Sequence, residues 1–313
     1  MTEPIPDDLR PARAPGSLDG LVEVARGYAR DAVAANTRRA YAADWAGFER
    51  WTRRRGLAEI TPDAALVALY LADCASGAGG ERPVSVATIE RRLAGIRRVL
   101  RLQGRPLDGR DRALAEVIAG IRRRHARPPR VKAALAPDEI LAMADALPRD
   151  LRGLRDRAIL LLGYAGGLRR SEIVGLDLDR DAGGGGAGWI EILDRGALLR
   201  VRGKTGWREV AVGRGSGPRS CPVHALERWL EFAAFLSGPL FRRVSRDGRR
   251  ALPDRLSDRH VARLVKRAAL AAGLRPDLPE AERLALFSGH SLRAGLASHA
   301  GIEERHVQRH LGH

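Results

Sequence analysis

Three short motifs in the second half of the sequence carry side chains that suit displacement chemistry at a phosphodiester. GGLRRSEIVGL places Arg169 three residues before Glu172, VRGKTGWREV places Lys204 in a glycine-flanked turn, and GHSLRAGLASHA places His290 three residues before Arg293. Two guanidiniums with paired N–H groups stabilise the negative charge that grows on the non-bridging oxygens. A lysine ammonium can protonate an alkoxide leaving group. The chain has no convincing carboxylate cluster for a two-metal nuclease, so we expect neither a metal ion nor another cofactor.

Each motif also has a purely structural interpretation. Arg169 and Glu172 can form a buried ion pair, and Lys204 can be an ordinary surface residue. His290 can lie in a capped helix with the hydrogen bonds of its side chain satisfied. Lys204 favours the chemical interpretation because only Lys132, Lys204 and Lys266 are lysines among the 55 basic residues. Lysine can be tuned to release a proton, whereas arginine effectively cannot.

The composition predicts a polyanionic partner and a soluble protein. The 313 residues carry a net charge of +17 with a pI near 11.2, which favours nucleic acid bound through phosphates, although an arginine bias can also reflect genome composition. Cys74 and Cys221 are too few for a disulfide framework or a cysteine zinc site. The chain lacks an apolar stretch of about 20 residues and the basic-then-apolar order of a secretory signal, so we expect a cytoplasmic location without membrane contact.

The first half of the chain predicts a helical domain. Tyr41, Trp45, Phe48 and Trp51 recur at helical spacing, which favours core packing over base stacking. A helix from Ser85 to Leu102 has an apolar side and an arginine-bearing side, which either binds duplex phosphates or is simply solvated. Further helices are predicted at 63–75 and 111–124. The predicted DNA-binding residues are Thr37, Arg38, Arg39, Arg91, Arg98 and Arg101.

The second half predicts helices around a small antiparallel sheet. RRRHARPPRVK reads as an extended linker because tandem prolines cannot continue a helix, and a new helix begins at Pro137. A helix at 156–164 precedes Arg169. A strand at Trp189–Leu193 and a hairpin at 197–212 follow, with helices at 224–232 and 257–272. The fold class is therefore mainly α with a small antiparallel β-sheet.

The order of the motifs resembles the tyrosine recombinase and integrase family, over about residues 18–313. NTRRAYAADWAGFERW is also similar to the start of that family's SAM-like core-binding domain. The resemblance implies a flexible N-terminus (1–16), a helical core-binding domain (17–125), a linker (126–135) and a DNA breaking-rejoining catalytic domain (136–313), the two domains clamping double-stranded DNA. By that match Arg169 and Arg293 bind the scissile phosphate, Lys204 is the general acid, His290 is a proton-transfer partner, His313 takes the second histidine position and Glu172 supports Arg169.

The family's tyrosine nucleophile is expected two to three helical turns beyond the LGH histidine. The four tyrosines, Tyr28, Tyr41, Tyr70 and Tyr164, all precede the His-x-x-Arg motif. We therefore expect the catalytic domain to be incomplete after HVQRHLGH and this chain not to cleave DNA. We also expect weakened assembly of the family's DNA-bound tetramer. The alternatives are a non-catalytic DNA-binding remnant or regulator on the same scaffold, and a tyrosine donated by another subunit. In its complete form the protein is predicted to perform site-specific recombination or integration through a 3′-phosphotyrosine intermediate.

Overall fold

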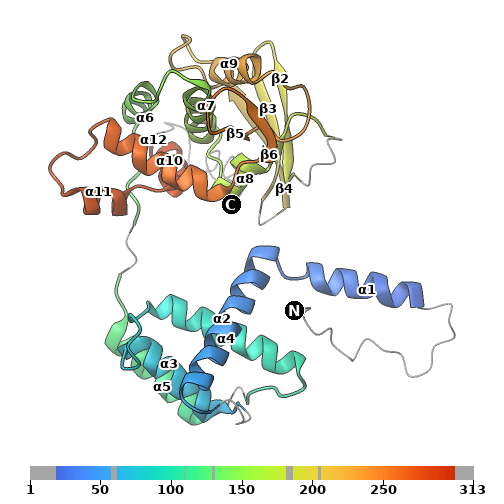
Figure 1. The fold of residues 1–313 in the computed structure, drawn as a ribbon, viewed down its shortest axis with the longest axis vertical. Helices are drawn as coiled ribbons and strands as arrows, with labels where there is room; N and C mark the ends of the chain where they lie inside the picture. Colours follow the sequence, from blue (N-terminus) through green and yellow to red (C-terminus); the bar gives the residue numbers. More distant parts are fainter. Residues whose placement is uncertain are drawn as a thin grey trace. The chain divides into compact units, whose positions relative to one another are not determined.

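The computed structural model divides the chain into two compact units, Met1–Pro129 and Arg130–His313 (Figure 1). The structure describes residues 19–57, 62–108, 110–128, 131–180, 186–203 and 206–299. None of the helices in these ranges has the length and apolar character that crossing a lipid bilayer requires.

The described part of the first unit is helical. Asp63, Ser85 and Asp111 cap three of its helices, each accepting a hydrogen bond from a backbone N–H in the first turn. The predicted aromatic stripe packs in the core, with Phe48 and Trp51 buried and Trp45 against them. The helices are α1 (Asp19–Asp31), α2 (Ala35–Arg54), α3 (Ala64–Ser76), α4 (Val86–Leu102) and α5 (Arg112–His125).

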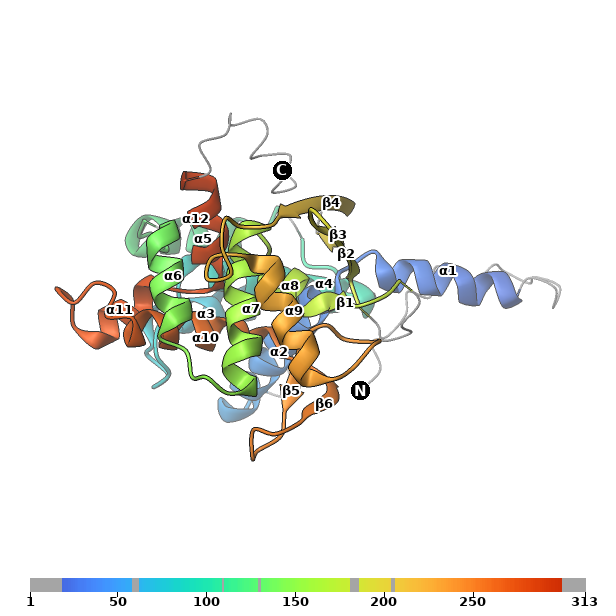
Figure 2. The ribbon, with the colours of Figure 1, turned by 90° about the horizontal axis from the view of Figure 1, so that it is seen from above.

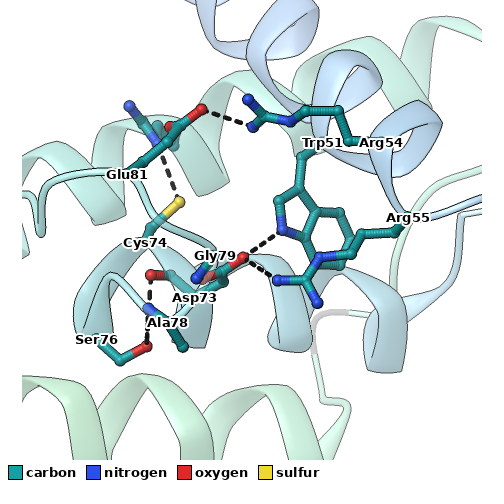
Figure 3. A network of polar contacts seen from close by, with 10 residues as sticks. Trp51, Arg54, Arg55, Asp73, Cys74, Ser76, Ala78, Gly79 and Glu81 are labelled. Carbon is teal, nitrogen blue, oxygen red and sulfur yellow. Dashed lines mark hydrogen bonds and ion pairs between the residues drawn. The ribbon is translucent and has the colours of Figure 1, made fainter.

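Asp73 ties α2 to α3 at the edge of this core (Figure 3). Its carboxylate accepts hydrogen bonds from the Trp51 indole at 2.6 Å, from Arg55 at 3.0 Å and from the backbone N–H of Gly79 at 2.5 Å. The hydrogen bond from Trp51, with those from Gly79 and Arg55, lowers the pKa of Asp73 despite the opposing effect of burial. The carboxylate therefore stabilises the unit in its ionised form.

Replacing Asp73 with asparagine is expected to destabilise the first unit by about 1–3 kcal/mol, because three donors lose a charged acceptor. The pKa of Asp73 is lower in the folded chain, so its contribution is present above its ordinary value of 3.8 and is lost as the pH falls through the folded value. Hydrogen exchange of the slowest α2 and α3 amides measures this loss. The control is Glu81→Gln, which removes an exposed ion pair to Arg54 and should cost less than about 1 kcal/mol. Equal effects of the two variants would contradict the role given to Asp73.

The second unit surrounds a four-stranded sheet of order β1-β2-β3-β4 with helices. The β2–β3 and β3–β4 pairs are antiparallel as predicted, and the short β1 adds a parallel pair to β2. Helices α7 and α9 lie side by side in both views (Figures 1 and 2). The helices are α6 (Pro137–Asp145), α7 (Leu151–Ala165), α8 (Arg170–Gly175), α9 (Pro222–Ala233), α10 (Asp258–Ala271), α11 (Glu280–Leu286) and α12 (Gly289–His299). The strands are β1 (Leu176–Asp177), β2 (Gly188–Leu193), β3 (Gly196–Gly203), β4 (Gly206–Gly213), β5 (Arg242–Val244) and β6 (Ala251–Arg255).

Two predicted boundaries differ from the structure. Helix α7 begins at Leu151 instead of residue 156, because Asp150 caps it by accepting a hydrogen bond from the Gly153 N–H at 2.8 Å. The predicted linker, 126–135, overlaps the second unit. Leu135 is fully buried there, and its N–H donates to the Ser291 carbonyl at 3.3 Å. The apolar side chain of Leu135 therefore binds the end of the predicted linker to the core next to α12.

Candidate active site

The turn between α7 and α8 carries Arg169 at the position just before α8. Gly167 turns the chain there with φ of 54°, a conformation that favours glycine. The Arg169 N–H donates to one oxygen of Glu172 at 2.8 Å, and its Nη1 donates to the other at 2.7 Å. The structural alternative of an Arg169–Glu172 pair is thus realised. The Arg169 side chain nevertheless remains 31% exposed, so the pair orients the guanidinium without burying it.

Arg208 on β4 is a second cation on the same carboxylate. Its Nη2 lies 2.8 Å from Oε2 of Glu172, and the two side chains are only 10% and 2% exposed. Burial alone would raise the pKa of Glu172. Hydrogen bonds from Arg169 and the charge of Arg208 outweigh burial and lower that pKa below its ordinary value. Glu172 is therefore a buried anion shared by two arginines.

Arg293 on α12 brings a third guanidinium to this cluster. It is 5% exposed, and its Nη1 donates to the Gly167 carbonyl at 2.8 Å. Burial, together with the charges of Arg169 and Arg208, lowers the pKa of Arg293 to about 10 against the opposing effect of Glu172. Because Arg293 is bound to the Gly167 carbonyl, two residues before Arg169, the fold brings these two arginines from distant parts of the sequence to the same turn. Three cations around one carboxylate leave excess positive charge, which favours an anionic ligand.

The turn end of the β3–β4 hairpin lies against this cluster. Gly203 and Gly206 pair across the two strands. A Cβ atom added to Gly203 would lie 3.1 Å from Oε1 of Glu172 and 3.3 Å from Nη1 of Arg169. A side chain at position 203 would therefore press on the ion pair. Lys204 belongs to the turn after Gly203 in the sequence, but it lies outside the described residues.

His290 is on the same helix as Arg293, but it is exposed where Arg293 is buried. Ser288 fixes the start of α12. Its Oγ accepts from the His290 N–H at 3.2 Å, and its own N–H donates to Oγ of Ser291 at 3.1 Å. The predicted His313 lies outside the described residues.

Sequence comparison identifies the family to which this chain belongs. The model of the phage integrase family matches residues 133–313, which is more than half of the chain. The chain is also 31% identical to tyrosine recombinase XerD of Mycobacterium tuberculosis, over 95% of this chain and 88% of that protein. This chain is a phage integrase family member. An integrase/recombinase XerD homolog of Selenomonas ruminantium is 29% identical, over 85% of this integrase and 73% of the relative.

Solved integrase structures share the fold. A lambda integrase (75–356) dimer bound to a COC′ core site matches with a TM-score of 0.54 at 17% identity, covering 94% of this chain and 90% of that one. XerH bound to palindromic difH in a post-cleavage complex matches with a TM-score of 0.52 at 17% identity, and the match covers 88% of this chain and 72% of the XerH chain. The comparison supports the predicted class, a helical N-terminal region and an integrase catalytic domain around small sheets.

The predicted DNA-binding arginines of the first unit of this integrase differ in their surroundings. Arg91 forms an ion pair with the buried Asp44 of α2. This contact joins α4 to α2, and burial raises the pKa of Asp44 more than Arg91 lowers it. Arg101 is exposed at the end of α4, without an ion pair to any carboxylate in the described ranges. The others are Arg38, which donates to the Val33 carbonyl, Arg39, which donates to Asn36, and Arg98 and Thr37, which are half-buried.

Arg208 was not among the site residues predicted from the sequence. Val210 and Val212 lie on one face of β4, and both are buried. Arg208 lies two residues before Val210, so the alternation of side chains along a strand places it on the same inner face. A charged residue on a buried face needs a partner. The alternation of the strand therefore indicates that Arg208 has a charged partner, but it does not identify Glu172 or its second partner, Arg169. Within the described residues, no three His, Cys, Asp or Glu side chains gather closely enough to hold a metal ion.

Proposed function

We propose that this protein is a site-specific DNA recombinase of the tyrosine type, which cleaves and rejoins DNA strands at one phosphodiester. The observation that carries the proposal is the convergence of Arg169 and Arg293 around Glu172, with Arg208 beside them. Buried or fixed guanidiniums gathered at one point are suited to a phosphate group whose charge grows during displacement.

In the proposed reaction a tyrosine oxygen attacks the phosphorus and the bond to the 5′ oxygen breaks, leaving a 3′-phosphotyrosine. Arg169 and Arg293 stabilise the non-bridging oxygens. Lys204, by its family resemblance, gives a proton to the departing 5′ oxygen, and His290 takes part in proton transfer from the exposed start of α12. His313 is proposed as the second histidine on the same resemblance. Rejoining reverses these steps, so the bond energy is kept in the covalent link.

The reaction requires a tyrosine hydroxyl, and the described residues of the second unit contain one tyrosine, Tyr164. Tyr28, Tyr41 and Tyr70 belong to the first unit. Tyr164 is half-buried on α7, and burial together with the charges of Asp138 and Glu139 raises its pKa. A raised pKa makes a hydroxyl a poorer nucleophile. The proposal therefore does not assign the nucleophile to Tyr164; in the family's pattern the tyrosine follows the His-x-x-Arg motif, and another subunit can also supply it.

Double-stranded DNA is the proposed partner. The net charge of +17 supports it, as do the DNA-bound states of the lambda integrase and XerH structures. We further propose that the complete protein assembles as a tetramer on DNA and acts in the cytoplasm.

A nicked suicide substrate tests the proposal. The duplex carries a site selected from a random pool by binding to the protein, and a denaturing gel detects covalent adducts. A form with a tyrosine beyond His313 should give an adduct that Arg169→Ala abolishes, while residues 1–313 alone should bind without forming one. An adduct from residues 1–313 would show that the nucleophile is misassigned.

The second candidate function is a DNA-binding regulator that does not cut. The position of all four tyrosines before Arg293 favours it. Sequence-specific binding without an adduct in the tyrosine-bearing form would support the regulator over the recombinase.

Replacing Arg101 with alanine should weaken DNA binding and lower the slope of log affinity against log salt by about 1, without loss of stability. The paired variant is Arg91→Ala, which removes the partner of buried Asp44 and should cost the first unit about 1–3 kcal/mol. Binding titrations at several salt concentrations, with hydrogen exchange of the α4 amides, separate the two effects. An unchanged salt slope for Arg101→Ala would remove this residue from the DNA contact.

A further inference from the structure

We infer that Arg208 is a positioning residue: it holds the β3–β4 hairpin on Glu172 and so fixes the end of the hairpin beside Arg169. The inference rests on the proposed function, because it concerns how the end of the hairpin is kept in position next to Arg169 in the proposed site. Arg208 is not placed on the phosphate itself.

The strand geometry separates Arg208 from its neighbours. Successive side chains of a strand point to opposite faces. Arg208 shares the inner face with Val210 and reaches Glu172, whereas Trp207 is exposed on the outer face opposite Arg202. The ion pair is therefore the charged link from the inner face of β4 to α8.

The hydrogen bonds of Glu172 predict what is lost with Arg208. Arg169 holds Glu172 twice, by its N–H and by its Nη1. Arg208 holds it with Nη2. If Arg208 is removed, Glu172 and Arg169 keep their mutual bonds, but β4 loses its bond to Glu172. We therefore expect the β3–β4 hairpin to move, while Arg169 stays in place.

The close approach of Gly203 makes this movement important. Its Cα sits so near the pair that an added Cβ would lie 3.1 Å from Glu172 Oε1. Only two residues, Lys204 and Thr205, separate Gly203 from Gly206 in the sequence. A shift of β4 would therefore carry the proposed general acid with it. Loss of Arg208 should consequently impair the step that needs an acid more than the stabilisation that Arg169 and Arg293 provide.

Hydrogen exchange of residues 1–313 tests the hold on the hairpin directly. In Arg208→Gln the amides of Gly206–Arg208 should exchange about 10- to 100-fold faster, the range expected for a lost hydrogen bond between charged groups. Arg202→Gln removes the same charge from the outer face of the same hairpin, and its exchange should stay within about threefold of the parent. The slowest α7 amides report global stability, and Arg208→Lys, which keeps a cation, should restore part of the protection. Unchanged exchange in Arg208→Gln would overturn the inference whether or not the protein cuts DNA.

Cleavage of two substrates tests the positioning. In a form that carries the tyrosine, Arg208→Gln should cut an ordinary suicide substrate about 10- to 100-fold more slowly, with DNA affinity unchanged. A 5′-bridging phosphorothiolate has a leaving group that needs no proton, so the variant should cut it at nearly the parent rate. Arg169→Ala should fail on both substrates. Equal loss on both substrates by Arg208→Gln would mean that Arg208 acts through Arg169, which would overturn the inference. Failure of the parent on both would instead count against the proposed function, while the exchange result would still decide the hold on the hairpin.

Discussion

Replacing Arg293 with methionine is expected to reduce DNA strand cleavage by at least about 10²- to 10³-fold while leaving the second unit nearly as stable as the parent. The loss of cleavage follows from the proposed contact of Arg293 with the scissile phosphate, which strengthens as charge develops. Binding of DNA should be largely kept, because many other cations contact the backbone.

The nearly unchanged stability expected for Arg293→Met follows from the pKa of Arg293, which is lowered from 12.5 to about 10. Folding therefore favours the neutral form, and the protonated side chain costs the fold on the order of 3 kcal/mol at neutral pH. Methionine removes this cost but leaves the Gly167 carbonyl without its donor, which costs about 1–3 kcal/mol. The two effects nearly cancel.

Arg155→Met is the matched control for a buried arginine with a structural role. Arg155 is buried and donates to Asp156 at 2.7 and 2.9 Å. Its removal takes two hydrogen bonds from the buried Asp156 carboxylate, which keeps His260 at 3.0 Å and Arg267 at 3.9 Å, and should cost about 3–5 kcal/mol. Hydrogen exchange of the slowest α7 amides compares both variants, and the tyrosine-bearing form supplies the cleavage rates. A similar loss of stability in the two variants would identify Arg293 as a structural residue and weaken the case for its role in chemistry.

Local sequence signals predicted the framework of the fold because their physical causes are local. Ser85 and Asp111 cap helices by bonding amides three residues away, and the aromatic stripe needed only the helical repeat to indicate a buried face. Helix α2 begins at Ala35 after Ala34, without a side-chain cap, so no capping residue marks its start in the sequence.

Partners across the fold could not be predicted from single residues. Arg91, on a polar helix face, is bound to buried Asp44, whereas Arg101 on the same helix is exposed. The sequence distinguishes them poorly because both are arginines at helical surface positions, and only the packing of α2 on α4 supplies the carboxylate. In the same way, Arg169 and Arg293 were paired by resemblance to a family, while the third cation depends on how β4 approaches α8. Long-range charge pairing is therefore the part of the site that required the structure.

Glu172→Gln has the second large expected effect, because this one carboxylate balances three guanidiniums. Glu172 is 2% exposed and bound by Arg169 and Arg208. Without its charge, Arg169 and Arg208 lose their shared anion next to the buried Arg293, and the glutamine N–H₂ group opposes arginine donors. Breaking a buried pair in this way should cost the second unit about 3–5 kcal/mol, measured by exchange of the slowest α7 amides. The control is Glu209→Gln, whose exposed pair with Arg200 should be worth less than about 1 kcal/mol.

The pH dependence provides an independent check on Glu172. Its pKa in the folded chain lies below the ordinary 4.5, so the stabilisation is complete above that value and is lost as the pH falls through the folded pKa. The parent should therefore lose its advantage over Glu172→Gln in acid, where the carboxyl is protonated in both the folded and the unfolded chain. DNA should bind the variant at least as tightly as the parent, since a negative charge next to the phosphate site is removed, yet cleavage should fall because Arg169 loses its orientation. Weaker DNA binding, or a stability difference that does not change with pH, would mean that Glu172 does not act as the shared anion of the arginine cluster.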